Sequence, residues 1–130
     1  MKQLFSFEKL LVWQKSIKLV TQIYEITKEF PSDEQFGITS QIRRSSLSIS
    51  CNLAEGSGKI TAKDKARYTS IAYGSTAETL NLIIVCKEIG LIKQETYQHL
   101  REQIEEIASM LSGLRKSQLK SSDLIKSGMN

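Results

Sequence analysis

QIRRSSLSISCNLAEG, the stretch from Gln41 to Gly56, keeps helical periodicity throughout but carries serines and charges where a bundle helix usually has leucines. At about 100° per residue, one face of this helix holds Ile38, Ile42, Ser45, Ile49 and Leu53. A nearly opposite face holds Leu47, Cys51 and Ala54, and a polar stripe holds Gln41, Arg44, Ser48, Asn52 and Glu55. The outer helix of a monomeric bundle needs one apolar face. Two faces therefore indicate a helix buried on several sides, including by a second copy of the chain.

Helical periodicity also extends on both sides of this stretch. The preceding segment predicts a helix from about Phe7 to Glu29, which Pro31 ends because a residue before proline disfavours the α conformation. The second helix is expected to begin at Ser32, with Ser32 and Gln35 forming a capping box. It should continue to about Glu55, before the Gly56-Ser57-Gly58 break.

Two further helices follow. The third is expected from the N-cap Thr61 to about Ile89, with one face made of Ala62, Ala66, Thr69, Tyr73, Thr76, Leu80 and Ile83. Its middle is made of small residues, and Gly74 predicts a close packing contact there because glycine weakens a helix. The fourth is expected from about Gln94 to Leu119, with a regular face of Tyr97, Leu100, Ile104, Ile107, Leu111, Leu114 and Gln118.

The architecture predicted from these segments is all-α. Four helices with short turns favour an antiparallel up-down-up-down bundle over residues 1–120, followed by a polar, frayed tail over 121–130. The 130 residues fit one domain, and the longest apolar runs are too short to span a bilayer. We expect a cytoplasmic protein without membrane contact. The surplus apolar faces of the helices favour assembly into a ring-like homo-oligomer.

Basic residues are grouped along a chain whose net charge is only +4. Lys59, Lys63, Lys65 and Arg67 surround Asp64, and a second group contains Arg115, Lys116, Lys120 and Lys126. Such a group is either a solvated face or a phosphate-binding surface. The pair Arg43-Arg44 is open to two interpretations as well, since arginine binds both phosphates and the carboxylates of a neighbouring chain.

Catalytic patterns are not found in the sequence. Cys51 and Cys86 lack metal-ligand spacing and are expected as reduced thiols in or near a core, and His99 has no Glu three residues before it. The residues Asn52, Glu55 and Glu78 are interpreted as a structural polar network shared with Arg43 or Arg44. We therefore expect no enzyme activity, no catalytic residue, no cofactor and no metal.

Five ordered landmarks carry a family resemblance. They are Phe7-x-x-Leu10-x-Val12-Trp13-Gln14-Lys15, Tyr24-x-x-Thr27-x-x-Phe30-Pro31, Gln41-Ile42-Arg43-Arg44, Ser48-Ile49-x-x-Asn52-Leu53-Ala54-Glu55-Gly56 and Ala72-x-Gly74-Ser75-x-x-Glu78. By them the chain resembles the ribosomal-protein-like four-helix bundles encoded in intervening sequences of bacterial 23S rRNA genes. The resemblance implies a homo-oligomer, with a pentamer favoured, in an RNA-linked context. Where Ser50-Cys51 stands, the family often has a proline that would bend the helix.

A distant relative of the family that the chain resembles is the accessory protein of diversity-generating retroelements. That protein is a basic pentamer that binds nucleic acid and a reverse transcriptase. The basic residues motivate the functional hypothesis of a non-enzymatic homo-oligomer that binds structured RNA or DNA through backbone phosphates. Its candidate contacts are Arg43, Arg44, Lys59, Lys63, Lys65 and Arg67. The alternative is a scaffold that docks a polypeptide partner without binding nucleic acid. A plain monomeric bundle is the third option.

Overall fold

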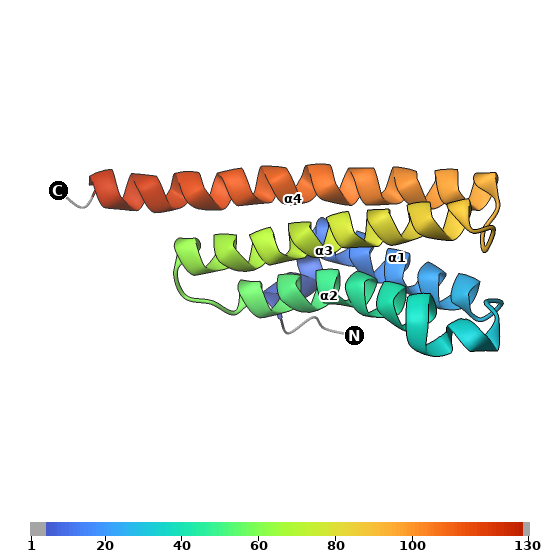
Figure 1. The fold of residues 1–130 in the computed structure, drawn as a ribbon. Coiled ribbons are helices and arrows are strands. Elements are labelled where there is room, and N and C mark those ends of the chain that lie inside the picture. The colour runs from blue at the N-terminus through green and yellow to red at the C-terminus, as the bar shows by residue number, and fades with distance from the viewer. Residues whose placement is uncertain (1–4, 129–130) are drawn as a thin grey trace.

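The computed structural model describes residues 5–128, and over that range the chain is all-α, as predicted, with no strand (Figure 1). A 3-10 turn at Ser6–Lys9 precedes the first long helix. The four long helices are α1 (Leu11–Thr27), α2 (Ser40–Ser57), α3 (Ala62–Glu88) and α4 (Gln94–Gly128). No helix within residues 5–128 is long and apolar enough to cross a membrane.

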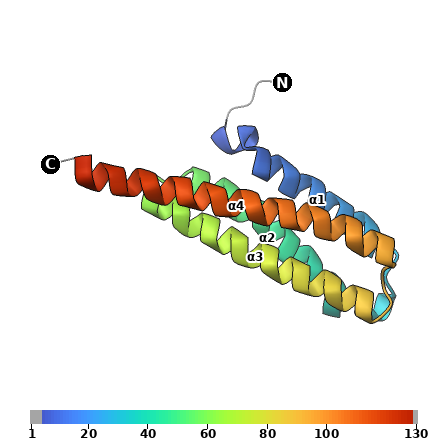
Figure 2. The same cartoon turned by 90° about the horizontal axis from the view of Figure 1, so that it is seen from above.

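The four helices lie side by side and alternate in direction (Figures 1 and 2). The α1–α2 and α3–α4 connections lie at one end of the bundle, and the α2–α3 turn lies at the other end. The last turns of α4 extend past the α2–α3 turn, so this helix projects beyond the bundle (Figure 1). The arrangement brings the start of α3 and the C-terminal half of α4 to the same end.

The apolar core is centred on the face of α4 that the sequence predicts. Tyr97, Leu100, Ile104, Ile107 and Leu111 are all buried, in the same cluster as side chains from the other three helices. Leu114 is partly buried against this cluster. Gln118, the last residue of the predicted face, accepts a hydrogen bond from Thr69 of α3. The regular spacing of three and four residues is therefore a correct guide to the packing of this helix.

Serines of α2 are buried because local carbonyls and α3 hydroxyls satisfy them. Ser45 and Ser46 each donate to the carbonyl three residues earlier in the helix, as does Ser50. Ser45 Oγ also lies 2.9 Å from Thr79 Oγ1, and Ser48 Oγ lies 2.7 Å from Ser75 Oγ. We call the Ser45, Ser48, Ser75 and Thr79 contacts the hydroxyl seam. These short side chains place polar groups between α2 and α3 without leaving them unbonded.

The second apolar face of α2 lies at the surface of the chain. Leu47 is 42% exposed, Cys51 is exposed and Ala54 is half-buried. The expectation of two thiols in or near a core is therefore correct for Cys86, which is 1% exposed, and wrong for Cys51. Cys51 follows the outward face because it lies about 180° around the helix from Ile42.

The start of the second helix differs from the prediction. Ser32–Glu34 forms a 3-10 turn with no side-chain cap, and Gln35–Thr39 forms a π-helical turn interrupted at Gly37 (φ −105°, ψ −116°). Glycine permits this backbone, and the α-helix begins only at Ser40. The predicted Ser32 capping box is thus wrong. α2 then runs without interruption through Ser50-Cys51.

The boundaries of α3 are close to those predicted, and its predicted face is correct in part, since Ala66, Thr69, Thr76 and Ile83 are buried. Thr61 Oγ1 accepts a hydrogen bond of 3.1 Å from the Asp64 amide, which confirms the N-cap. Tyr73, expected in the core, is 46% exposed, because α3 packs between α2 and α4 and its buried face is shifted around the helix. That face consists of Ala66, Thr69, Ala72, Thr76, Thr79, Leu82, Ile83 and Cys86.

Gly74 and the end of α4 also depart from expectation. A Cβ built on Gly74 meets no atom within 4 Å, so the predicted close packing is not found within the chain. The helix α4 continues to Gly128, past the predicted end at Leu119 and through residues 121–128 of the stretch expected as a frayed tail, whose last two residues lie outside the described range. No glycine or proline occurs between Gly113 and Gly128, and each added residue extends a helix by one hydrogen bond.

Candidate nucleic-acid interface

The basic cluster of Lys59, Lys63, Lys65 and Arg67 lies at the α2–α3 turn and on the first turns of α3. Lys63 and Arg67 are exposed, whereas Lys59 and Lys65 are half-buried. Lys63 and Arg67 are four residues apart and therefore share one helix face. Asp64 is the acidic side chain within this segment, and it is exposed in the first turn of the same helix.

Tyr68 holds two of these cations in place. Lys59 Nζ lies 5.0 Å from the centroid of its ring, and Arg67 Cζ lies 5.4 Å from it, both within cation–π range. The body of the tyrosine packs on α2 at Gly56, where an added Cβ would lie 2.7 Å from Tyr68 Cβ. The glycine therefore lets the end of α2 approach α3 closely, and that approach positions the cationic turn.

The pair Arg43-Arg44 is divided between two faces of α2. Arg43 Nε donates to Thr27 Oγ1 at 2.7 Å, and its guanidinium lies 4.6 Å from the Tyr24 ring centroid, so it is engaged with α1. Arg44 is exposed on another face of the helix. Since one partner contacts α1 and the other faces the α2–α3 groove, the structure does not bring the pair together with the basic cluster.

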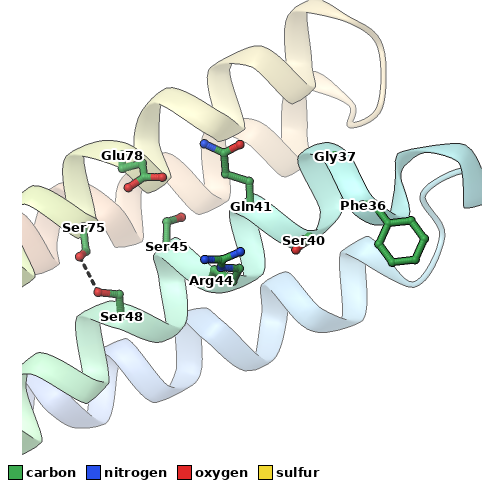
Figure 3. Close-up of a pocket in the computed structure, with 9 residues that line it drawn as sticks. All are labelled: Phe36, Gly37, Ser40, Gln41, Arg44, Ser45, Ser48, Ser75 and Glu78. Atoms are coloured by element: carbon green, nitrogen blue, oxygen red, sulfur yellow. Dashed lines mark hydrogen bonds between the residues drawn. The ribbon is translucent and has the colours of Figure 1, made fainter.

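Arg44 and Glu78 line the same pocket between α2 and α3, of about 410 Å³ (Figure 3). Its other lining residues are Phe36, Gly37, Ser40, Gln41, Ser45, Ser48 and Ser75. The close-up shows the Arg44 guanidinium and the Glu78 carboxylate on different helices, with serine hydroxyls between them. The pocket is thus an opening between α2 and α3 whose wall includes Ser45, Ser48 and Ser75 of the hydroxyl seam. Phe36, 92% exposed, lies at its edge.

The polar network expected at Asn52, Glu55 and Glu78 is smaller than predicted. Asn52 Nδ2 donates to the Ser48 carbonyl at 2.8 Å and to Ser48 Oγ at 2.9 Å. Ser48 Oγ in turn forms a hydrogen bond with Ser75 Oγ. Glu55 and Glu78 are both exposed, Glu78 at the α2–α3 pocket, and within residues 5–128 no ion pair or hydrogen bond joins either carboxylate to Asn52 or Ser48. The network therefore consists of Asn52 and the serines.

A second basic group joins the first at the same end of the bundle. Arg115 Nε donates to Ser70 Oγ at 2.6 Å, and Thr69 donates to Gln118 at 2.8 Å, so α4 is fixed against α3 beside the cluster. Lys116 and Lys120 are exposed on α4, and the Lys126 side chain lies outside the described part of the chain. Both basic groups are visible in the sequence. They lie at the same end of the bundle because α3 and α4 run antiparallel, which the predicted topology already implies.

The two ends of the bundle differ in charge. Residues 55–67 and 115–123, at one end, contain seven cations, Lys59, Lys63, Lys65, Arg67, Arg115, Lys116 and Lys120, and three carboxylates, Glu55, Asp64 and Asp123. Residues 25–34 and 87–95, at the other end, contain six carboxylates, Glu25, Glu29, Asp33, Glu34, Glu88 and Glu95, and three lysines, Lys28, Lys87 and Lys93. The modest net charge therefore conceals a basic end and an acidic end.

The described residues offer little covalent or metal chemistry. Within residues 5–128 no group of three or more His, Cys, Asp or Glu side chains is placed to hold a metal ion. Burial, together with the nearby negative charge of Glu34, raises the pKa of the Cys86 thiol to about 11, so the thiol is protonated at neutral pH. What the basic end can do chemically is to attract and bind anions.

Comparison with known proteins gives a family and a related fold. A search of curated proteins gave no match. The fold matches the crystal structure of a protein of unknown function from the S23 ribosomal protein family of Bacteroides thetaiotaomicron, with a TM-score of 0.76 and 24% identity. The match covers 82% of this chain and 96% of that one. Residues 8–113 match the family model described as 23S rRNA-intervening sequence protein, and the chain belongs to that family.

Proposed function

We propose that the chain is a non-enzymatic, cytoplasmic, homo-oligomeric helical bundle that binds structured nucleic acid, RNA in preference, through backbone phosphates. The observation that carries the proposal is the segregation of charge, because the basic side chains of α3 and α4 gather at one end of the bundle. The name of the family links its members to intervening sequences of 23S rRNA, which favours RNA as the ligand.

The chemistry of the cluster favours phosphates over bases. Lys63 and Arg67 are exposed cations on one helix face, suited to contact successive phosphates. Tyr68, the aromatic residue within the cluster, is half-buried and carries cations over its ring, so it offers no free surface for base stacking. Binding should therefore be sequence-tolerant and weaken steeply with salt.

Self-association is the second part of the proposal. Leu47 on α2 and Ile71 on α3 are 42% and 43% exposed, and Cys51 and Gly74 are exposed on the same two helices. A second copy that covered these residues would bury apolar surface and bring several basic ends into one assembly. Native mass measured by light scattering tests this directly, and a value near 14.7 kDa would exclude it.

Charge reversal at the two ends tests the nucleic-acid site. The variant K59E/K63E/R67E should lose at least tenfold in affinity for a structured RNA hairpin at about 0.1 M salt, since three phosphate contacts are removed. The matched control K18E/K28E/K93E changes the net charge equally at exposed positions in α1 and in the connections at the opposite end of the bundle. Its affinity should fall much less.

Equal losses in the two variants would show that only total charge matters, and would contradict the assigned site. An oligomer that binds neither RNA nor duplex DNA at low salt would exclude the proposed function. Recovery of one protein partner in a nuclease-treated pull-down would then support the alternative, a scaffold that docks a polypeptide.

A further inference from the structure

A separate pocket lies between α3 and α4 next to the basic cluster. Its volume is about 310 Å³, and it is lined by Ser70 and Tyr73 from α3 and by Leu111, Ser112, Arg115 and Lys116 from α4. Leu111 is fully buried beneath the pocket, while Tyr73, Arg115 and Lys116 are exposed around it. An exposed aromatic side chain with cations beside it suits a planar ring that carries a phosphate.

The cations of the pocket continue the basic cluster of α3. Ser70, whose hydroxyl accepts the Arg115 bond, is three residues after Arg67 and seven after Lys63, so all three share one face of α3. Arg115 uses its Nε for Ser70 at 2.6 Å and keeps its terminal nitrogens as donors. A run of cations therefore leads from the start of α3 to the pocket.

Tyr73 distinguishes this pocket from the rest of the basic end. Its side chain is 46% exposed and does not belong to the apolar core cluster. It makes no hydrogen bond within residues 5–128, and no cation lies over its ring there, unlike Tyr68. Exposed aromatic rings beside arginines are where proteins stack unpaired bases.

We propose that the α3–α4 pocket binds one unpaired nucleotide of an RNA, with the base stacked on Tyr73 and its phosphates on Arg115 and Lys116. This rests on the proposed function and adds to it, because the basic cluster by itself needs only a backbone. A base held in a duplex cannot reach the ring, so the preferred ligand is a helix interrupted by a bulge or loop. Ser112 is the remaining polar side chain, and the pocket should discriminate weakly among bases.

Two fluorescent RNA hairpins that share a stem test the inference, one fully paired and one with a single bulged uridine. The full-length protein should bind the bulged hairpin about 5- to 150-fold more tightly, the effect of one base–aromatic stack. Tyr73→Ala should abolish the preference and leave the affinity for the paired hairpin unchanged. Tyr73→Phe should keep it, because the ring remains.

Tyr24 provides a matched control, since it is 39% exposed on α1 with a cation over its ring. Tyr24→Ala should preserve the preference for the bulge, and thermal melts should show that each variant is folded. Equal affinity of the wild-type protein for both hairpins, with normal salt dependence, would overturn the pocket and leave the proposed function in place. A preference that survives Tyr73→Ala would also overturn it. Binding to neither hairpin would exclude the pocket and the proposed function together.

Discussion

The contact of α2 with α3 and the contact of α4 with the core use different chemistry. The first contains the hydroxyl seam, in which Ser45 pairs with Thr79 and Ser48 pairs with Ser75. The second depends on fully buried leucines and isoleucines of α4, namely Leu100, Ile104, Ile107 and Leu111. Burial of a large apolar side chain stabilises by about 1.5–3 kcal/mol, and a neutral hydrogen bond by about 1 kcal/mol. The comparison indicates that α4 supplies stability, while the seam sets the distance and register of α2 on α3.

The largest effect should come from the α4 side. Ile104 is 1% exposed within the core cluster, so Ile104→Ala removes buried methyl groups and leaves a cavity. We expect a loss of about 2–5 kcal/mol in the free energy of unfolding, measured by urea denaturation. A loss below 1 kcal/mol would mean that α4 is not the main source of stability.

Cys86, on the buried face of α3, should make stability fall at alkaline pH. Its folded-state pKa is about 11 against an ordinary 9.0, so between these values the unfolded chain releases the proton and the folded chain keeps it. Stability is unaffected below pH 9 and decreases from pH 9 to 11, by up to about 2–3 kcal/mol. Thermal melts of the wild-type protein and Cys86→Ala across this range measure the difference, and parallel curves would contradict the prediction.

The two thiols should differ in reactivity at neutral pH, because Cys51 on α2 is exposed and Cys86 on α3 is buried. Exposed Cys51 should react with a thiol reagent in the folded protein, and Cys86 should react only after unfolding.

A pair of glycine substitutions tests whether close approach matters at the α2–α3 contact. Gly56→Ala places a Cβ 2.7 Å from Tyr68 Cβ and should destabilise the protein by about 1–3 kcal/mol, since neither backbone can move freely. Gly74→Ala meets open space and should stabilise the monomer by about 0.5–1 kcal/mol through helix propensity. Chemical denaturation measures both. Similar effects at the two sites would show that the close approach at Gly56 is unimportant.

The smallest effect is expected within the hydroxyl seam. Ser45→Ala and Thr79→Val should each lower the free energy of unfolding by about 0.5–1.5 kcal/mol. The effect is small because the hydroxyl that remains in each variant still bonds a carbonyl of its own helix. A double-mutant cycle measures their coupling, which should be about 0.5 kcal/mol or more in favour of the native pair. Strict additivity would mean that the Ser45–Thr79 contact does not stabilise the fold.

Local signals explain what could be predicted from the sequence. The Thr61 cap, the end of α3 and the buried face of α4 depend on residues within a few turns of one another. The exposure of Tyr73 and the engagement of Arg43 with Thr27 depend on which helices pack on either side, and no local pattern encodes that. The same is true of the site. The two basic groups are evident in the sequence, but they lie side by side only because α3 packs antiparallel on α4.

The central claim, that the basic end binds a nucleic-acid backbone, is tested most directly by the salt dependence of RNA binding. Affinity of the purified protein for a structured hairpin would be measured across a salt series, with native mass recorded on the same samples. We predict an oligomer whose log affinity falls linearly with log salt, and a slope that K63E/R67E makes less steep by about 1.5–2. A slope unchanged by this variant, or binding indifferent to salt, would contradict the account.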